Sequence, residues 1–322
     1  MPDANLLIIH QGALGDFILT FPAVIRLQAY YRAIDVLCQN QLGKLAGTLG
    51  LAKSWYALES ASWASLFTNQ IDPKIKALLK PYGKIILFSL SDQLEKSINR
   101  VTEKPVCRIP PRPLVQERIH VAQFVLDNIF DCGLIKKTDA KLDNLPLPVR
   151  KGRPQKSRKI LLHPGAGSIR KRWPASNFLQ VETVLKDDGL KPEFVLGPAE
   201  DSLANELQQA DRLVHILADL TDLAALLESA GGYIGNDSGA SHLAAYLGLP
   251  ATVIFGPADP ARWVPIGRAV RIVRPDLQCR PCFETDPANC DDPQCMAAIQ
   301  PQKVVEAFYK VYPLKAGFDR RS

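Results

Sequence analysis

Short apolar runs alternate with amphipathic segments along the first half of the chain. The runs have the length of buried strands and lie at Leu6–His10, Val36–Cys38, Ser54–Ala57, Ile85–Phe88 and Val106–Ile109. The spacing of apolar residues predicts helices at Phe17–Tyr31, Asp72–Lys80 and Glu117–Phe130. Strands that alternate with helices are typical of a parallel sheet covered on both faces, so we predict an α/β fold.

The alternation stops between Lys141 and Lys159, a stretch rich in proline and charge that we interpret as a linker. It resumes with strands predicted at Ile160–His163, Glu193–Leu196, Tyr233–Gly235 and Thr252–Phe255. Helices are predicted at Ala175–Lys186, Ser202–Gln209, Thr221–Ser229, Gly239–Leu247 and 301–311. We therefore predict two Rossmann-like domains, residues 1–150 and 151–322, with parallel sheets that face a central cleft. We leave open whether the final helix packs back on the first domain.

The composition narrows the class of protein. With 322 residues, 47% hydrophobic and 22% charged, the chain fits a soluble globular protein with two cores. The apolar run Leu6–Ile9 is too short for a signal peptide. The apolar stretch Leu243–Phe255 is interrupted by Gly248 and Pro250 and falls short of the ~20 residues of a membrane span. These features predict a cytoplasmic protein, with peripheral contact at the inner membrane as an option.

The charge of the chain is modest but uneven. The net charge is +6, and the stretch from Arg150 to Arg172 holds nine Lys or Arg and no acidic residue. This stretch is either a solvated linker or a surface for an anionic ligand such as a phosphate or a lipid head group. No nucleic-acid-binding motif or aromatic platform accompanies it, so we do not predict nucleic-acid binding.

Seven cysteines are an odd number in a chain without an export signal, which favours reduced thiols or a metal site over a disulfide framework. Cys279, Cys282, Cys290 and Cys295 have knuckle-like spacing that suits structural zinc. The alternative is that these four are thiols without a metal. We place neither possibility in a catalytic mechanism.

The first loop with candidate chemistry is His10-Gln-Gly-Ala-Leu-Gly-Asp16, which follows a predicted strand and opens a helix. Gly12 and Gly15 allow a sharp turn and close approach to a ligand, but the spacing is not that of a dinucleotide-binding loop. Asp16 lies at the start of the helix. Its carboxylate is either stabilised by the helix dipole or acts as a general base.

The second loop is His163-Pro-Gly-Ala-Gly-Ser168, followed by Ile-Arg-Lys-Arg-Trp-Pro174. Small residues after a strand and then three cations suit a diphosphate, although the spacing is not that of a P-loop. Lys171 and its neighbour Arg172 are candidates to neutralise an anionic leaving group. The alternative is surface charge before a helix.

The third loop is Gly235-Asn-Asp-Ser-Gly239-Ala-Ser-His242, which also opens a helix. Backbone N–H groups at a helix N-terminus form an anion site. Ser238 can cap the helix or bind a phosphate, Asp237 can accept from a ligand hydroxyl, and His242 lies within reach. An ordinary capped turn is the alternative.

A rigid Gly256-Pro257 corner follows the next predicted strand and leads to Asp259 and Arg262. Proline fixes the backbone at this corner, so the loop after it has a defined direction. These residues either wall a substrate pocket or form a structural turn.

Together these segments resemble glycosyltransferase family 9, the bacterial ADP-heptose:lipopolysaccharide heptosyltransferases. The matching pieces follow the family's order and cover nearly the whole chain. They are Gly12–Asp16 with Thr20-Phe-Pro-Ala23, Lys171-Arg-Trp-Pro174, Asn236–Ala244, and Phe255-Gly-Pro with Asp259-Pro260.

The resemblance implies a GT-B fold, with the acceptor on the N-terminal domain and the nucleotide sugar on the C-terminal domain. It implies an inverting transferase that requires no metal or cofactor, with ADP-heptose as donor and a lipopolysaccharide core or another anionic glycolipid as acceptor. Asp16 matches the family's catalytic base and Lys171 the lysine at the donor phosphates. Asp237, Ser238, Gly239 and His242 match the donor loop, and Glu200 matches loosely a glutamate near the donor ribose.

Two other functions are compatible with these residues. One is a GT-B-like nucleotide-sugar epimerase or hydrolase, which needs no acceptor. The other is a nucleotide-sugar-binding protein without catalysis, against which the presence of both Asp16 and Lys171 counts.

Overall fold

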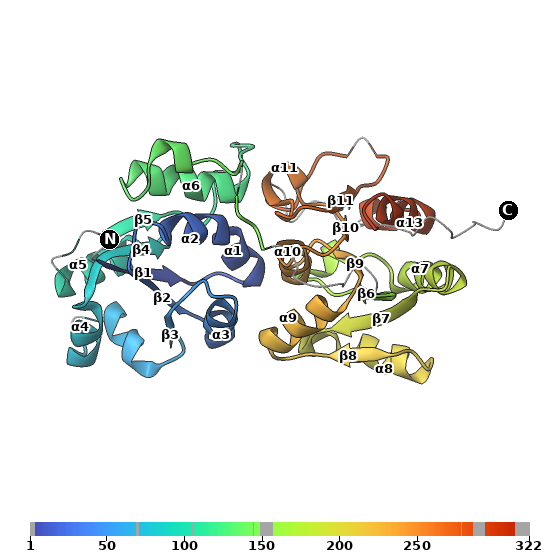
Figure 1. Cartoon of the computed structure of the whole chain (residues 1–322), viewed down its shortest axis with the longest axis horizontal. Coiled ribbons are helices and arrows are strands. Elements are labelled where there is room, and N and C mark those ends of the chain that lie inside the picture. The colour runs from blue at the N-terminus through green and yellow to red at the C-terminus, as the bar shows by residue number, and fades with distance from the viewer. Residues whose placement is uncertain are drawn as a thin grey trace. The chain divides into compact units, whose positions relative to one another are not determined.

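The computed structural model describes residues 4–68, 71–102, 104, 106–143, 145–148, 157–277, 279–285 and 294–312. The chain divides into two compact units, Met1–Pro146 and Leu147–Ser322 (Figure 1). Each unit contains its own parallel sheet, as the predicted pair of Rossmann-like domains requires. Residues 149–156 of the predicted linker, and with them the predicted boundary at residue 150, lie outside the described residues.

The first unit contains a five-stranded parallel sheet in the order β3-β2-β1-β4-β5. Its strands are β1 (Asn5–His10), β2 (Ala33–Cys38), β3 (Ser54–Ala57), β4 (Tyr82–Phe88) and β5 (Val106–Ile109). The strand order reverses between β1 and β4. In open α/β sheets, ligands bind at the carboxyl ends of the strands beside such a reversal.

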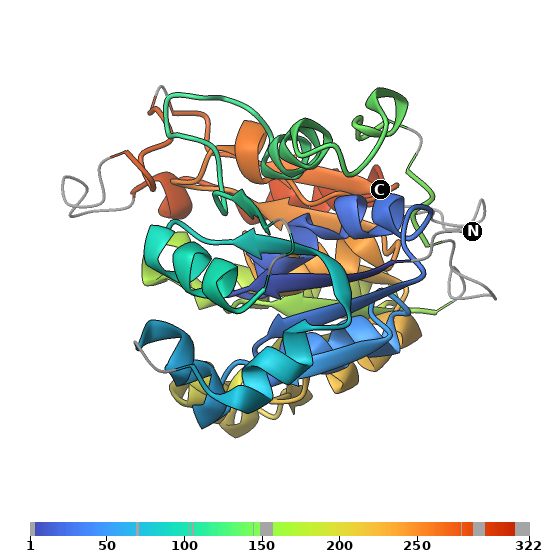
Figure 2. The same ribbon diagram turned by 90° about the vertical axis from the view of Figure 1, so that its left-hand side faces the viewer.

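Helices cover both faces of this sheet (Figure 2). Leu7 and Ile9 point into a core on one face, whereas Leu6 and Ile8 are buried on the other, so β1 is apolar throughout. The helices are α1 (Leu14–Leu19), α2 (Phe21–Leu27), α3 (Asn40–Thr48), α4 (Pro73–Leu79), α5 (Asp92–Val101) and α6 (Val121–Asp131). Short 3-10 helices lie at Ala61–Phe67 and Lys137–Asp139.

The second unit contains a six-stranded parallel sheet in the order β11-β10-β9-β6-β7-β8. Its strands are β6 (Lys159–His163), β7 (Lys191–Leu196), β8 (Val214–Ile216), β9 (Gly232–Asn236), β10 (Ala251–Ile254) and β11 (Val270–Val273). Here the order reverses between β6 and β9. The loops after these two strands are therefore the expected place for a ligand of this unit.

The described part of the second unit contains the 3-10 helices η4 (Ile169–Lys171) and η5 (Pro198–Glu200), and the α-helices α7 (Ala175–Asp187), α8 (Asp201–Gln209), α9 (Leu220–Ser229), α10 (Gly239–Tyr246), α11 (Pro260–Trp263), α12 (Gln294–Ala297) and α13 (Pro301–Tyr309). Residues of α7, α8, α12 and α13 form a large core together with one face of the sheet. Phe308 of α13 packs so closely on Gly232 that a Cβ there would lie 2.7 Å from its ring. The buried face of the final helix is thus used within the second unit, whereas the sequence left open a return to the first.

The helix predicted as Phe17–Tyr31 is divided into α1 and α2. The Thr20 hydroxyl donates to the carbonyl of Phe17 at 2.7 Å, which offers that carbonyl an alternative to the helical ladder. Pro22 has no N–H to continue the ladder. The helix predicted from Glu117 begins instead at Val121, because the His120 side chain caps it by accepting from the N–H of Ala122 at 3.2 Å.

No helix in the described parts of the chain has the combination of length and apolar character that a membrane span needs. The apolar stretch around Gly248 is divided between α10 and β10. Both elements belong to the core of the second unit. The sequence-based prediction for this stretch is therefore confirmed.

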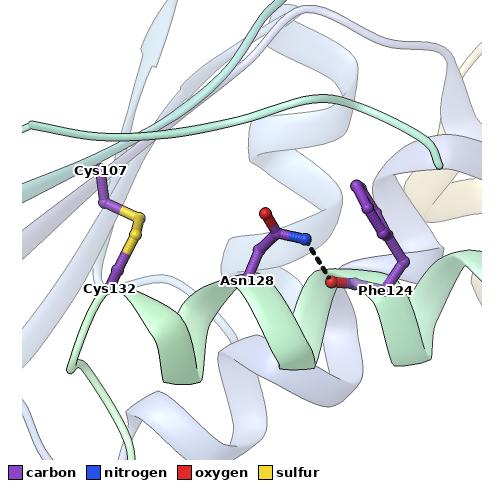
Figure 3. The surroundings of a disulfide bond; sticks show 4 residues. All are labelled: Cys107, Phe124, Asn128 and Cys132. Carbon is purple, nitrogen blue, oxygen red and sulfur yellow. Dashed lines mark hydrogen bonds between the residues drawn. A yellow bond between two sulfur atoms is a disulfide. The ribbon is translucent and has the colours of Figure 1, made fainter. Parts of the chain in front are cut away.

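A disulfide joins Cys107 of β5 to Cys132 at the end of α6 (Figure 3). Helix α6 runs back along the sheet, so its last turn meets the beginning of β5, with 6.1 Å between the two Cα atoms. The prediction of reduced thiols is therefore wrong for this pair. That prediction was based on the number of cysteines and on the expected cellular compartment, whereas the pairing of Cys107 with Cys132 follows from the path of the chain.

We expect replacement of Cys132 by serine to lower the free energy of unfolding of the oxidised protein by about 3 kcal/mol, because the crosslink closes a loop of intermediate length. Urea unfolding with and without dithiothreitol measures this. Dithiothreitol should destabilise the wild-type protein but not the variant. Cys279→Ser, at an exposed thiol, is the control and should respond to dithiothreitol like the wild type. A wild-type protein insensitive to dithiothreitol would contradict the crosslink.

Candidate active site

Asp16 lies in the first turn of α1, immediately after β1 and therefore beside the strand reversal of the first sheet. Its carboxylate is partly exposed and close to Gly12, where an added Cβ would lie 3.3 Å from Asp16 Oδ2. Gly12 thus leaves room for the carboxylate; the close approach to a ligand predicted for Gly12 stays a prediction. Gly15 lies within the same helical turn.

His10, the last residue of β1, stabilises this loop. Its ring is 1% exposed and contacts the rings of Phe17 and Phe88. Burial lowers the pKa of His10 to about 4, so the imidazole is neutral near pH 7. Its Nδ1 accepts the N–H of Gly12 at 3.2 Å, which fixes the turn against Asp16. The sequence analysis gave His10 no role, although a histidine that ends an apolar run beside glycine was a usable signal.

In the second unit the structure brings Lys171 and Asp237 together. Lys171 ends η4 after β6, and Asp237 follows β9, so both lie beside the strand reversal. Lys171 Nζ is 2.8 Å from Asp237 Oδ2, with side chains 19% and 6% exposed. Burial raises the pKa of Asp237, and the charge of Lys171 opposes that rise. A cation with one buried partner is therefore held at the ligand-binding edge.

Asp237 is followed in the chain by Ser238, Gly239 and His242, at the start of α10. The Ser238 side chain caps α10 by accepting the N–H of Ser241 at 3.4 Å. Gly239 is the first residue of α10, and His242 is buried in its first turn. The positive end of the α10 dipole thus begins beside Asp237.

Asn236, to which the sequence analysis gave no role, joins the two loops. Its Nδ2 donates to the carbonyl of Pro164 at 2.8 Å, and its Oδ1 accepts the N–H of Trp173 at 3.1 Å. Trp173 is itself anchored by a hydrogen bond from Nε1 to the carbonyl of Ile299. The loop after β6 is therefore fastened to the end of β9 by one buried amide. An asparagine at the end of an apolar strand was the only sequence signal.

A second charged pair lies on the other side of the β6 loop. Glu200 Oε1 is 3.3 Å from Arg172 Nη2, and Oε2 accepts the N–H of Gly197 at 2.8 Å. Arg172 also donates to the carbonyl of Ala166. An added Cβ on Gly165 would lie 2.8 Å from Glu200 Oε1, so the buried carboxylate lies directly against the loop backbone.

Ser168 and the Asp259–Arg262 turn make local contacts, and the predicted place of Ser168 in a diphosphate-binding loop stays a prediction. Ser168 caps η4 by accepting the N–H of Arg170 at 3.3 Å. Asp259 caps α11 by accepting the N–H of Ala261 at 3.0 Å. Arg262 is 2% exposed and pairs with Glu284 at 2.9 Å. Of the two interpretations left open for this turn, the contacts support the structural one.

Cys279, Cys282 and Cys295 are thiols that line one cavity of about 350 Å³ together with Arg274 and Arg280. Cys290 lies outside the described residues. Among the residues that are described, no three His, Cys, Asp or Glu side chains are grouped so that they could hold a metal. The zinc hypothesis for the four cysteines stays a prediction.

The family model for glycosyltransferase family 9 (heptosyltransferase) matches residues 133–290. Lipooligosaccharide heptosyltransferase 2 of Campylobacter jejuni is 34% identical over 173 residues, which is 50% of this chain and 52% of that protein. Lipopolysaccharide heptosyltransferase 3 of Escherichia coli K12 is 30% identical over 162 residues, 47% of this chain and 44% of that protein. The match to this chain thus spans about half the length of these curated relatives.

Two solved structures resemble the whole chain. The glycosyl transferase family 9 structure from Veillonella parvula gives a TM-score of 0.77 at 16% identity, covering 97% of this chain and 98% of the other. The E. coli ADP-heptose lps heptosyltransferase II gives 0.74 at 19% identity, covering 96% and 98%. At these identities the likeness concerns the fold, and it confirms the GT-B prediction.

The buried His10 predicts a specific pH dependence of stability. The unfolded chain binds a proton at His10 below about pH 6.5, whereas the folded chain does so only near pH 4. The stabilisation is therefore complete above pH 6.5 and is lost as the pH falls to 4, by about 3 kcal/mol in total.

His10→Asn, whose amide oxygen can replace Nδ1 as acceptor, should remove this component. Urea unfolding of both proteins at pH 7, 6 and 5 measures the difference, and the contribution of the other histidines cancels between them. Equal loss of stability in the two proteins would contradict the assignment.

Proposed function

Because the model of glycosyltransferase family 9 matches residues 133–290 of this chain, we propose that the protein moves a heptose from ADP-heptose to a lipopolysaccharide-core acceptor. We propose that the transfer inverts the anomeric configuration and needs no metal or cofactor. The observation that carries the proposal is the buried Lys171–Asp237 pair at the ligand-binding edge of the second sheet. The choice of donor is supported by the similarity to a lipooligosaccharide heptosyltransferase and to the fold of the E. coli ADP-heptose lps heptosyltransferase II.

On the donor side, the second unit supplies positive charge from two sources. Lys171 offers an ammonium group, and the N-terminus of α10 offers backbone N–H groups with Gly239 as its first residue. Departure of ADP leaves charge on the diphosphate. Fixed cations and dipoles that stabilise this charge lower the barrier without a metal ion.

Glu200 is proposed to bind the ribose of the donor. A carboxylate offers about four acceptor positions. One oxygen of Glu200 is bound to Gly197 and the other to Arg172, so acceptor capacity remains for sugar hydroxyls. Since Arg172 belongs to the second unit and pairs with Glu200, we propose that it serves the donor side.

On the acceptor side, Asp16 is proposed as the general base. Its carboxylate takes the proton of the acceptor hydroxyl while that oxygen attacks the anomeric carbon. The bond from this carbon to the diphosphate oxygen breaks, and ADP leaves with the bonding electrons. Attack on the face opposite the leaving group inverts the configuration. His10 holds Gly12 against Asp16 without competing for the proton, because it is neutral and already an acceptor.

The proposal is tested by incubating the purified protein with ADP-heptose and a truncated lipopolysaccharide core. ADP should be released only when both substrates are present, the acceptor should gain the mass of one heptose, and EDTA should not slow the reaction. Isomerisation or hydrolysis of the donor alone would indicate an epimerase or hydrolase instead. Binding without turnover would indicate a non-catalytic binding protein. A cytoplasmic location and contact with the inner membrane stay predictions.

Asp16→Asn should lower kcat by about 10²–10⁴-fold, because it removes the base and keeps the size of the side chain. The dissociation constant of ADP, measured by calorimetry, should stay within about twofold of wild type, since Lys171 and α10 are unaltered. Asp131→Asn, at an exposed carboxylate of the same unit, is the matched control and should keep wild-type turnover. If Asp16→Asn had normal turnover but bound ADP more weakly, the assignment of Asp16 as the general base would be wrong.

A further inference from the structure

The ammonium group of Lys171 has a second neighbour that the proposed mechanism does not use. Its Nζ lies over the ring of Phe283, 4.2 Å from the centroid, while Asp237 Oδ2 is 2.8 Å away. Arg170 lies over the same ring at 5.8 Å. A cation within about 6 Å of an aromatic face is attracted by the negative potential of the ring.

The ring is held in place by the segment 282–284 and not by Lys171. The N–H groups of Cys282 and Phe283 both donate to the carbonyl of Pro257, at 2.9 and 3.0 Å. Phe283 packs against the buried cluster of Val253, Phe255 and Ala258. The aromatic face is thus fixed by the Gly256-Pro257 corner.

Glu284, the next residue after Phe283, provides a second anchor. Its Oε2 accepts from Arg262 Nε at 2.9 Å and from Trp263 Nε1 at 2.9 Å. Both donors belong to α11, and the side chain of Arg262 is buried. The segment is therefore fastened at both of its ends, which makes Phe283 a rigid platform for a long, flexible lysine side chain.

The ring and Asp237 act on Lys171 in different ways. Asp237 neutralises the ammonium and competes with any phosphate that approaches it. The ring attracts the cation without a lone pair or a formal charge, so it does not take the place of a phosphate oxygen. A lysine held by the ring keeps its position when a diphosphate replaces part of its contact with Asp237.

We propose that Phe283 is a positioning residue that holds Lys171 for the diphosphate of the donor. This inference rests on the proposed function, in which Lys171 binds that diphosphate. Its competitor is a purely structural role, in which the ring only fills space on Val253, Phe255 and Ala258.

The test is the dissociation constant of ADP, measured by calorimetry for the wild type, Phe283→Leu, Lys171→Met and the double variant. Phe283→Leu keeps apolar bulk and removes the π face, so it should weaken ADP binding by about 2- to 30-fold. In the Lys171→Met background, the same change should have an effect of less than about twofold, because the ammonium group that the ring positions is absent while Arg170, at 5.8 Å from the same ring, is present in all four proteins. Phe283→Tyr, which keeps the aromatic ring, should bind ADP with the affinity of the wild type.

Steady-state kinetics give a second readout. Phe283→Leu should raise the KM for ADP-heptose by a similar factor and change kcat less, since Asp16 is untouched. Should Phe283→Leu fail to fold, Phe283→Met offers a flexible apolar replacement for the same measurements.

The inference is overturned if Phe283→Leu binds ADP like the wild type, if it weakens binding equally with and without Lys171, or if Phe283→Tyr behaves like Phe283→Leu. Failure of the proposed function has a different signature, namely that Lys171→Met alone leaves ADP binding unchanged.

Discussion

A buried ion pair between Lys171 and Asp237 is the constraint on which the site of the second unit depends. Removing two charges from water is costly, and removing one partner of such a pair would leave the other uncompensated. The pair forms because β6 and β9 are neighbours in the sheet, so their loops begin side by side, and Asn236 fastens these loops to each other. The loop after β9 leads into α10, and Arg172 in the loop after β6 pairs with Glu200, which follows β7. The cation, the dipole and the carboxylates therefore all lie at the carboxyl ends of these strands.

In the first unit, the candidate catalytic residue lies at the same place in the sheet topology as the ion pair does in the second unit. Asp16 follows β1 at the strand reversal, as Lys171 follows β6. Here His10, a neutral and buried imidazole, supports the loop by accepting the N–H of Gly12. A base must be able to take up a proton, and a neutral imidazole does not oppose that. The loop of the proposed base in the first unit is thus fixed by a hydrogen bond to a neutral ring, whereas the proposed anion site of the second unit contains a buried ion pair.

Most strands and the loops of the candidate site could be predicted from the sequence, whereas contacts between distant residues could not. Apolar runs located most of the strands, because strands buried on both faces are apolar throughout. The short β8 and the more exposed β11 were not predicted, whereas β3 was predicted although it is only partly buried. The loops at Asp16, Lys171 and Asp237 were found because glycines and charges follow strands. Their partners were missed: Phe283 is remote from Lys171 in the chain. The disulfide was missed because cysteine counts do not show which helix end meets which strand.

The central claim is that Lys171 serves the diphosphate of a nucleotide, and comparing two ligands tests it most directly. The dissociation constants of ADP and adenosine should be measured for the wild type and for Lys171→Ala. The account predicts that the variant loses about 10- to 100-fold in affinity for ADP while its affinity for adenosine is unchanged, as expected when one charge-assisted contact is removed. Unchanged binding of ADP, or an equal loss for both ligands, would contradict it.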